Sequence, residues 1–139
     1  MLPAQENAED TQWIGESAEA LPRVALIVDD EMPIRRLLAR LLERRGYTVI
    51  EAESGDAALS MAREQALGLV VCDVRMPGMT GVDLFAQLCA SRPELRRHFV
   101  FMSGDTAQPL GDEVMRDMPV LNKPFTSADL DAALEKTQI

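Results

Sequence analysis

The sequence predicts an α/β fold in which helices cover both faces of a five-stranded parallel sheet. Short, nearly continuous apolar runs recur along the chain, and they are separated by longer segments in which apolar residues return every three or four positions. Continuous apolar runs are typical of parallel strands buried on both faces, whereas the longer period is that of an amphipathic helix. Strands that alternate with helices in this way form parallel, doubly wound sheets.

The first part of the pattern contains two strands and two helices. Strands are expected over residues 23–28 and 47–52. Pro33 begins the first helix, where the missing N–H of proline costs nothing, and Gly46 ends it. The second helix is expected to run from residues 54–56 through about residue 65. The inward face of the first helix is marked by apolar residues at helical spacing: Ile34, Leu37, Leu38, Leu41 and Leu42.

The second part adds three strands, expected over residues 69–72, 98–102 and 120–122, and three helices. A turn-rich loop leads into the third helix, which ends before Pro93, and a short polar helix is expected near residues 112–117. Thr126 or Ser127 caps the last helix. The predicted inward residues of the third and last helices are Val82, Phe85, Leu88 and Cys89, then Leu130, Ala133 and Leu134.

Composition excludes several classes of protein. The 139 residues fit one domain, and a formal net charge of −9 argues against nonspecific nucleic-acid binding and against an anionic membrane surface. No apolar run approaches the roughly 20 residues that a membrane-spanning helix needs, and the N-terminus lacks the pattern of a secretory signal. Cys72 and Cys89 fall in an apolar strand and on an apolar helix face, which predicts buried reduced thiols and a cytoplasmic protein.

Residues 1–22 differ from the domain expected over residues 23–139. They contain no Lys or Arg, and Trp13 and Ile14 are among their few large apolar residues. Such a segment cannot bury much surface, which predicts a flexible acidic tail or the remnant of a linker. The alternative is a short helix around Trp13 that docks on the domain or on a partner. The acidic residues of the segment are Glu6, Glu9, Asp10, Glu16 and Glu19.

Chemically active side chains stand where four of the predicted strands end. Asp29 and Asp30 end the first strand and Asp73 ends the third. Ser103 and Lys123 end the fourth and fifth strands. Because parallel strands present their carboxyl ends at one edge of a sheet, these five residues are expected to meet there. Asp29 and Asp30 alone also fit a helix N-cap pair ahead of Pro33, but that alternative leaves the other three unexplained.

These residue types suit a divalent cation and a phosphoryl group. Carboxylates at close range repel one another, and Mg²⁺, which prefers oxygen ligands, relieves that repulsion. Asp30 and Asp73 are the expected direct ligands, with Asp29 acting through a water and a backbone carbonyl just past Asp73 completing the set. A carboxylate is also a nucleophile toward phosphorus, and Ser103 and Lys123 can each bind a phosphoryl oxygen.

The chain resembles the receiver domain of two-component response regulators over about residues 23–137. Four motifs carry the resemblance: Val-Asp-Asp-Glu at 28–31, Val-Cys-Asp-Val-Arg-Met-Pro-Gly-Met-Thr-Gly at 71–81, Phe-Met-Ser-Gly at 101–104, and Asn-Lys-Pro-Phe at 122–125. The resemblance implies a flavodoxin-like fold with strand order 2-1-3-4-5. It also implies a cis peptide bond before Pro124, which aims Lys123 into the site.

The resemblance further implies a phosphorylation-dependent signalling switch rather than an enzyme. Asp73 is the implied phosphoacceptor, and its phosphoryl donor is a histidine kinase or a histidine phosphotransfer domain. Mg²⁺ is implied to bind Asp29, Asp30, Asp73 and the backbone carbonyl of Arg75, while Ser103 and Lys123 sense the phosphate. The output is expected through the face formed by the fourth helix, the fifth strand and the fifth helix, on a monomer or weak dimer.

The sequence departs from the family pattern in three places: at two positions near the site, and in the stretch of residues 103–123, which is a little short and in which the expected helix is weak and polar. Val120 stands where the family often has an aromatic switch residue. Arg75, two residues beyond the phosphoacceptor, either pairs with Asp105 or Asp29 and screens the phosphate, or points to solvent while its carbonyl serves the metal. Gly104 and Asp105, directly after Ser103, are the other residues expected to modulate the reaction.

The kinase is expected to dock on the first helix and on the loop after the fifth strand, at Ile34, Arg35 and Phe125. The run of residues 101–106 also resembles receivers attached to hybrid histidine kinases, and an acidic segment precedes the domain, which favours an excised receiver over a free regulator. A Mg²⁺-dependent aspartyl-phosphate phosphatase is disfavoured, because Arg75 occupies the place of the second acid that such an enzyme needs. The remaining alternative is a receiver-like binding module that takes no phosphate.

Overall fold

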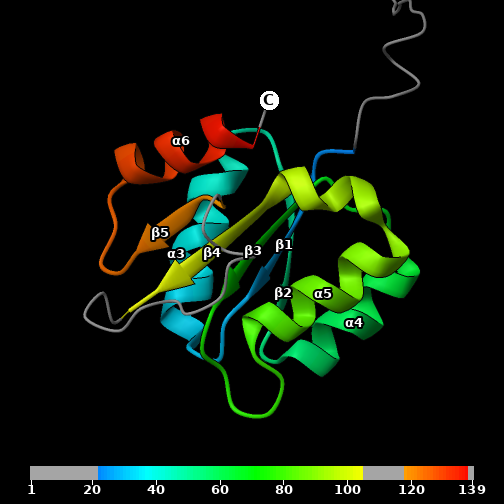
Figure 1. Cartoon of the computed structure of the whole chain (residues 1–139). Helices are drawn as coiled ribbons and strands as arrows, with labels where there is room; N and C mark the ends of the chain where they lie inside the picture. Colours follow the sequence, from blue (N-terminus) through cyan, green and yellow to red (C-terminus); the bar gives the residue numbers. More distant parts are fainter. Residues whose placement is uncertain (1–21, 105–117, 138–139) are drawn as a thin grey trace, which may run out of the picture.

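A five-stranded parallel sheet with the order β2-β1-β3-β4-β5 forms the centre of the molecule (Figure 1). The computed structural model describes residues 22–104 and 118–137. The predicted fold class and strand order are confirmed. The strands are β1 (Val24–Val28), β2 (Thr48–Ala52), β3 (Leu69–Asp73), β4 (Phe99–Ser103) and β5 (Val120–Asn122).

Helices cover both faces of this sheet (Figure 1). The α4 helix (Gly55–Glu64) and the α5 helix (Gly81–Ser91) lie on one face, and the α3 helix (Met32–Glu43) and the α6 helix (Ser127–Lys136) lie on the other. A 3-10 helix, η1 (Pro93–His98), follows α5. Neighbouring residues of each strand enter opposite cores: Leu26 packs toward α4 and α5, whereas Ile27 packs toward α3 and α6.

Capping side chains fix where the helices begin. The Ser54 side chain accepts a hydrogen bond from the backbone N–H of Ala57 at the start of α4. Thr80 and Thr126 each form a reciprocal capping box with the aspartate three residues later. Thr126, rather than Ser127, is therefore the cap of the last helix. Pro33 lies in the first turn of α3, as predicted.

Two details of the predicted elements are wrong. Leu37 was expected to face inward, but its side chain is 44% exposed and Ala39 is buried instead, because the core face of α3 is centred on Leu38 and Leu42. The fourth strand begins at Phe99, since His98 completes η1, a helix that the apolar pattern does not reveal. The helix expected near residues 112–117 and the tail of residues 1–21 lie outside the described residues.

The two cysteine thiols and the length of the helices bear on the remaining predictions from composition. Cys72 and Cys89 are both free; Cys72 is fully buried in β3, but Cys89 on α5 is only half-buried. Burial and the nearby charge of Asp73 raise the pKa of the Cys72 thiol far above its ordinary value, so this thiol stays protonated. Among the described residues, no helix has the length and apolar character needed to cross a bilayer.

Candidate functional site

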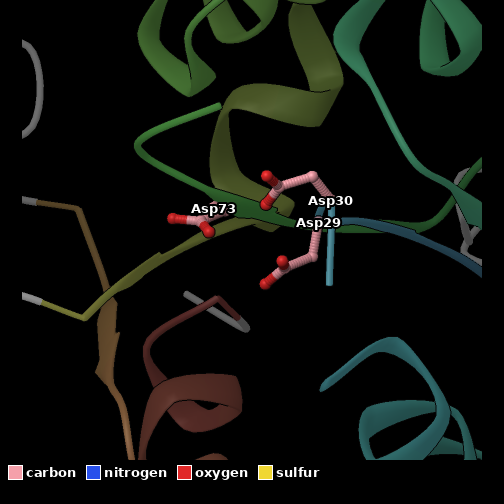
Figure 2. A group of neighbouring side chains, drawn as sticks. All are labelled: Asp29, Asp30 and Asp73. Carbon is pink, nitrogen blue, oxygen red and sulfur yellow. The ribbon is translucent and has the colours of Figure 1, made fainter. Parts of the chain in front are cut away.

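Three aspartates meet at the carboxyl edge of the sheet (Figure 2). Val28 pairs with Cys72 in the β1–β3 ladder, which places the residues that follow each of them side by side. One carboxylate oxygen from each of Asp29, Asp30 and Asp73 lies within 4.8 Å of the others. Asp29 and Asp73 are buried, and Asp30 is exposed. The predicted acid cluster is therefore present, with one side open to solvent.

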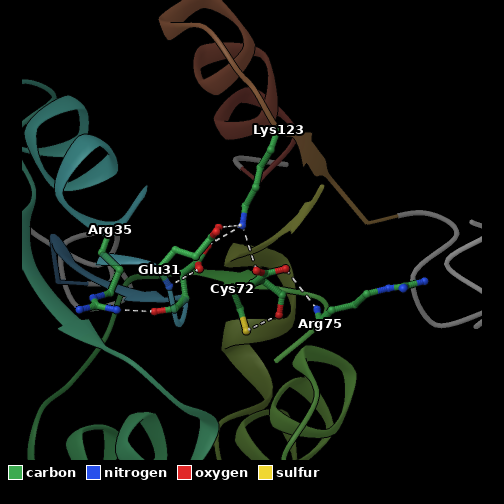
Figure 3. A network of polar contacts seen from close by, with 7 residues as sticks. Glu31, Arg35, Cys72, Arg75 and Lys123 are labelled. Carbon is green, nitrogen blue, oxygen red and sulfur yellow. Dashed lines mark hydrogen bonds and ion pairs between the residues drawn. The ribbon is translucent and has the colours of Figure 1, made fainter. Parts of the chain in front are cut away.

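Lys123 places its ammonium group between these carboxylates (Figure 3). It directly follows β5, and the Lys123–Pro124 peptide bond is cis, as predicted. Lys123 Nζ lies 2.8 Å from Asp29 Oδ2 and 2.9 Å from Asp73 Oδ2. It also lies 3.3 Å from Glu31 Oε1, at the solvent side. One cation thus contacts three acidic side chains, one from the end of β3 and two from the loop after β1.

The two ionisable partners are shifted in pKa by burial and by each other. Burial disfavours the charged form of Lys123, but its close contact with Asp29, its hydrogen bond to Asp73 and the Coulomb attraction of both carboxylates outweigh burial and raise the lysine pKa. Burial also raises the pKa of Asp73, and hydrogen bonds from Lys123 and from the backbone of Arg75 offset this only in part. Lys123 is therefore charged at neutral pH, while the Asp73 carboxylate remains costly to ionise.

The two carboxylate oxygens of Asp29 differ in their hydrogen bonds. Its Oδ1 accepts a hydrogen bond from the Glu31 backbone N–H at 2.9 Å. Its Oδ2 is fully buried and lies in ion-pair contact with Lys123, yet it accepts no well-oriented hydrogen bond from any described residue. A buried carboxylate oxygen without a hydrogen bond is expensive, and a hard cation beside it would remove that cost. The donor set, all oxygen, fits Mg²⁺.

The loop after β3 is fixed by backbone contacts. The Arg75 N–H donates to Asp73 Oδ1 at 3.1 Å, while the Arg75 side chain is exposed and extends away from the aspartates (Figure 3). This orientation matches the alternative in which the guanidinium points to solvent and does not pair with Asp29. Asp105, the other suggested partner, lies outside the described residues. Gly81 packs directly on this loop, because a Cβ there would lie 2.3 Å from the Asp73 carbonyl oxygen.

Ser103 and Val120 occupy the β4–β5 side of the site. Ser103 is the last residue of β4, is 7% exposed, and accepts a hydrogen bond on its carbonyl oxygen from the Lys123 N–H at 2.8 Å. Gly104 follows it, with the Lys123 stem 3.7 Å from where a Cβ would stand. Val120 is half-buried against the core on the α4–α5 side and pairs with Phe101 in the sheet. The structure thus brings Ser103 next to Lys123, as predicted.

The predicted docking residues lie beside the aspartates, but one of them is turned inward. Ile34 and Phe125 are half-buried on the α3–α6 side of the sheet. Arg35 donates to the Asp29 carbonyl oxygen at 2.6 Å and to Glu51 Oε1 at 3.2 Å, and only 15% of its side chain is exposed. Arg35 is therefore bound by Asp29 and Glu51 of the same chain. Its role in docking stays a prediction.

Sequence reasoning missed three contributors to the site. Glu31 was quoted within a motif but given no role, although it contacts Lys123. Arg35 was assigned to docking, although it holds the backbone of Asp29. Gly81 was expected only to form part of the turn-rich loop before the third helix, although its lack of a side chain lets α5 approach Asp73. The position of Glu31 directly after two aspartates was the only available signal; the other two contacts are visible only in three dimensions.

Comparison with known proteins identifies the family of this site. The model of the response regulator receiver domain matches residues 25–135. The response regulator receiver protein CpdR of Brucella abortus is 33% identical over 116 residues, which cover 82% of this chain and 95% of CpdR. The transcriptional regulatory protein FixJ of Rhizobium meliloti is 34% identical over 112 residues, 79% of this chain but only 54% of FixJ.

Solved structures agree in fold. The receiver domain protein from Clostridium thermocellum superposes with a TM-score of 0.72 at 25% identity and covers 82% of this chain and 92% of its own. FixJ-N superposes with a TM-score of 0.69 at 31% identity, covering 82% and 91% of the two chains. The acid cluster, the lysine at the end of β5 and these matches together show that the chain belongs to the response regulator receiver domain family.

Proposed function

We propose that this chain is a phosphorylation-dependent switch in which Asp73 accepts a phosphoryl group from a histidine kinase or a histidine phosphotransfer domain. The observation that carries the proposal is the position of Lys123, whose ammonium lies 2.9 Å from Asp73 Oδ2 at the open edge of the acid cluster. A fixed cation beside a carboxylate stabilises the negative charge of an incoming phosphoryl group.

Asp29, Asp30 and Asp73 would hold Mg²⁺, together with the Arg75 carbonyl oxygen. When bound, this ion would neutralise charge on the phosphoryl oxygens. The metal set is supported by the clustering of the three carboxylates and by the buried Asp29 Oδ2, which pairs with Lys123 but accepts no well-oriented hydrogen bond from the described residues. Two observations support the role of the Arg75 carbonyl. The Arg75 side chain points away from the site (Figure 3), and the Arg75 backbone N–H is hydrogen-bonded to Asp73.

In the transfer step, an oxygen of Asp73 attacks phosphorus, the P–N bond to the donor histidine breaks, and the imidazole leaves with a proton. The Arg75 N–H holds Asp73 Oδ1 at 3.1 Å and so fixes the orientation of the nucleophile. Lys123 then moves from the Asp73 carboxylate to a phosphoryl oxygen, and the Ser103 hydroxyl binds another.

The phosphate at Asp73 would be read out on the β4–β5 side of the domain. Ser103 and Lys123 are linked through their backbones, so a shift of either residue moves the ends of both strands. Val120 lies next to Leu121 on β5, and β5 packs against α6. With valine at this position, we expect a packing change rather than the rotation of an aromatic ring to carry the signal, toward the face formed by β5 and α6.

We further propose that the switch works in the cytoplasm, as a monomer or weak dimer, either free or as the receiver of a hybrid kinase. The Virulence sensor protein BvgS of Bordetella pertussis is 39% identical over 93 residues, 66% of this chain and 8% of BvgS. A phosphatase finds no support in the site, because Arg75 is exposed and turned away from Asp73 where a general acid would be needed.

The test is incubation of the whole chain with acetyl phosphate and Mg²⁺, followed by intact mass. We expect one added phosphoryl group, which is absent from Asp73→Asn. Asp56→Asn, which changes an exposed aspartate at the start of α4, is the matched control and should be labelled like the unsubstituted protein. Equal labelling of Asp73→Asn would contradict the proposal, and no label from any donor would support the binding module.

A further inference from the structure

The outward side of α3 carries both exposed apolar and exposed basic side chains. We call it the α3 outer face and define it by Met32, Arg36, Leu37, Arg40 and Arg44, all of which are exposed. Met32 is 52% and Leu37 is 44% exposed, and within residues 22–104 and 118–137 these are the two large apolar side chains that are exposed. Exposed apolar patches bordered by polar residues mark interaction sites, and Met and Arg are enriched at interfaces.

Positive charge is concentrated on this helix in an otherwise acidic chain. Five of the 14 Lys and Arg residues lie between positions 35 and 45, whereas the formal net charge of the chain is −9. Arg35 and Arg45 are turned toward Glu51 and Asp131. Arg36 is 65% exposed and touches only the edge of Glu51, at 3.6 Å. Arg40 and Arg44 have no ion-pair partner in the part of the chain that the structure describes.

The N-terminal segment enters the domain beside this helix. Arg23 donates from Nε to the Gly46 carbonyl oxygen at 3.4 Å and also contacts the carbonyl oxygen of Arg45. Its guanidinium lies over the Tyr47 ring, 4.3 Å from the centroid. Because Gly46 follows the C-terminal end of α3, these contacts hold residue 23 at that end. The described part of the chain therefore begins beside the C-terminal end of α3.

We propose that residues 1–21 dock on the α3 outer face of the same chain. The segment carries five acidic residues and no basic ones, which complements the three exposed arginines of that face, Arg36, Arg40 and Arg44. Trp13 and Ile14 supply apolar side chains for the exposed pair, Met32 and Leu37. The nine residue-to-residue steps from Trp13 to Pro22 span up to roughly 30 Å when extended, and α3 is about 18 Å long, so Trp13 reaches any point of the helix.

Two physical properties follow from this arrangement. The contact is intramolecular, so a short tether gives an effective concentration in the millimolar range and a weak contact suffices. It is also largely electrostatic at the surface, so salt should release it as the screening length falls. If the kinase docks on α3, a point that rests on the proposed function, the segment competes with the kinase for the same helix.

The test uses Trp13, the only tryptophan of the chain, in the whole protein. Its emission and its quenching by acrylamide are compared with those of the variant Arg36→Glu/Arg40→Glu/Arg44→Glu. We expect the variant, and high salt, to shift emission to the red and to raise the quenching constant. Arg63→Glu/Arg97→Glu is the matched control, since both arginines are exposed on other elements, and it should behave like the unsubstituted chain.

A second variant changes only the segment, so the fold of the domain is not at risk. Glu9→Gln/Asp10→Asn/Glu16→Gln should expose Trp13 as the arginine variant does. Quenching that is the same in all four proteins would overturn the proposal, and so would protection of Trp13 that depends on protein concentration, because that places the segment on a second copy. Labelling of Asp73 by acetyl phosphate requires no docked kinase, so it tests the proposed function separately.

Discussion

Lys123 Nζ lies 2.9 Å from Asp73 Oδ2, although the two residues are 50 positions apart in the chain. The contact exists because β3 and β5 flank β4 in one parallel sheet and end at the same edge. It leaves the phosphoacceptor candidate paired with the residue that we expect to bind the phosphate. Under the proposed function, phosphorylation of Asp73 would require Lys123 to exchange one anionic partner for another rather than to enter the site from solvent.

Removal of the lysine should destabilise the protein, and Mg²⁺ should restore part of the loss. Lys123→Ala leaves the buried carboxylates of Asp29 and Asp73 without a cation, which we expect to cost about 3 kcal/mol. Urea unfolding with and without Mg²⁺ measures this. Lys136→Ala, at the exposed end of α6, is the control and should change stability little. An equal effect of the two substitutions would contradict the buried network.

The stability of the protein should depend on pH through Asp73. Burial raises the pKa of Asp73 in the folded state above its ordinary value of 3.8. The folded state therefore binds more protons than the unfolded state just above pH 3.8, so this group contributes less stability as pH rises through its folded pKa.

Asp73→Asn removes this ionisation and should gain stability over the unsubstituted protein as pH rises from about 4 to 7, a range that begins at the ordinary carboxyl pKa. Thermal unfolding across this range, in the absence of Mg²⁺, measures the difference. Asp56→Asn, on the exposed side of α4, should show no such gain. A stability difference that shrinks as pH rises would show that the charged form of Asp73 is favoured in the folded state.

Gly81 should tolerate no side chain. A Cβ at this position would lie 2.3 Å from the Asp73 carbonyl oxygen, so Gly81→Ala must move the loop after β3 or the start of α5. We expect a loss of about 2 kcal/mol in unfolding free energy and slower labelling of Asp73. Gly104→Ala is the control for stability, because its Cβ would meet the Lys123 stem at an ordinary 3.7 Å. Similar losses at both positions would argue against a specific clash.

Arg35 allows its internal contacts to be separated from a docking role. If Arg35 mainly holds the Asp29 carbonyl oxygen, Arg35→Ala should weaken Mg²⁺ binding and slow labelling by acetyl phosphate, and Arg35→Lys should restore part of both. If Arg35 only contacts the kinase, labelling by acetyl phosphate should stay unchanged while transfer from the kinase falls. Arg36→Ala, at the exposed neighbouring position, should leave acetyl phosphate labelling intact.

The sequence was sufficient for the fold and for the meeting of the acid cluster with Ser103 and Lys123 at one sheet edge, because both rest on patterns that a chain displays locally. Apolar runs locate the strands, and Asp29, Asp73, Ser103 and Lys123 each stand where a run ends. The exposure of Leu37 was not predictable, since five apolar residues at helical spacing exceed what one contact face of α3 can bury. The orientation of Arg35 and the close packing of Gly81 depend on how neighbouring elements approach one another in space. The spacing of residues along the sequence does not show this.

The most direct test of the central claim is the position of the phosphoryl group. After incubation of the whole chain with acetyl phosphate and Mg²⁺, borohydride reduces an aspartyl phosphate to homoserine, which peptide mass spectrometry locates. We predict homoserine at position 73 and a dependence on Mg²⁺. Homoserine at any other aspartate, or its formation at an unchanged rate in Asp73→Asn, would contradict the assignment of Asp73 as the phosphoacceptor.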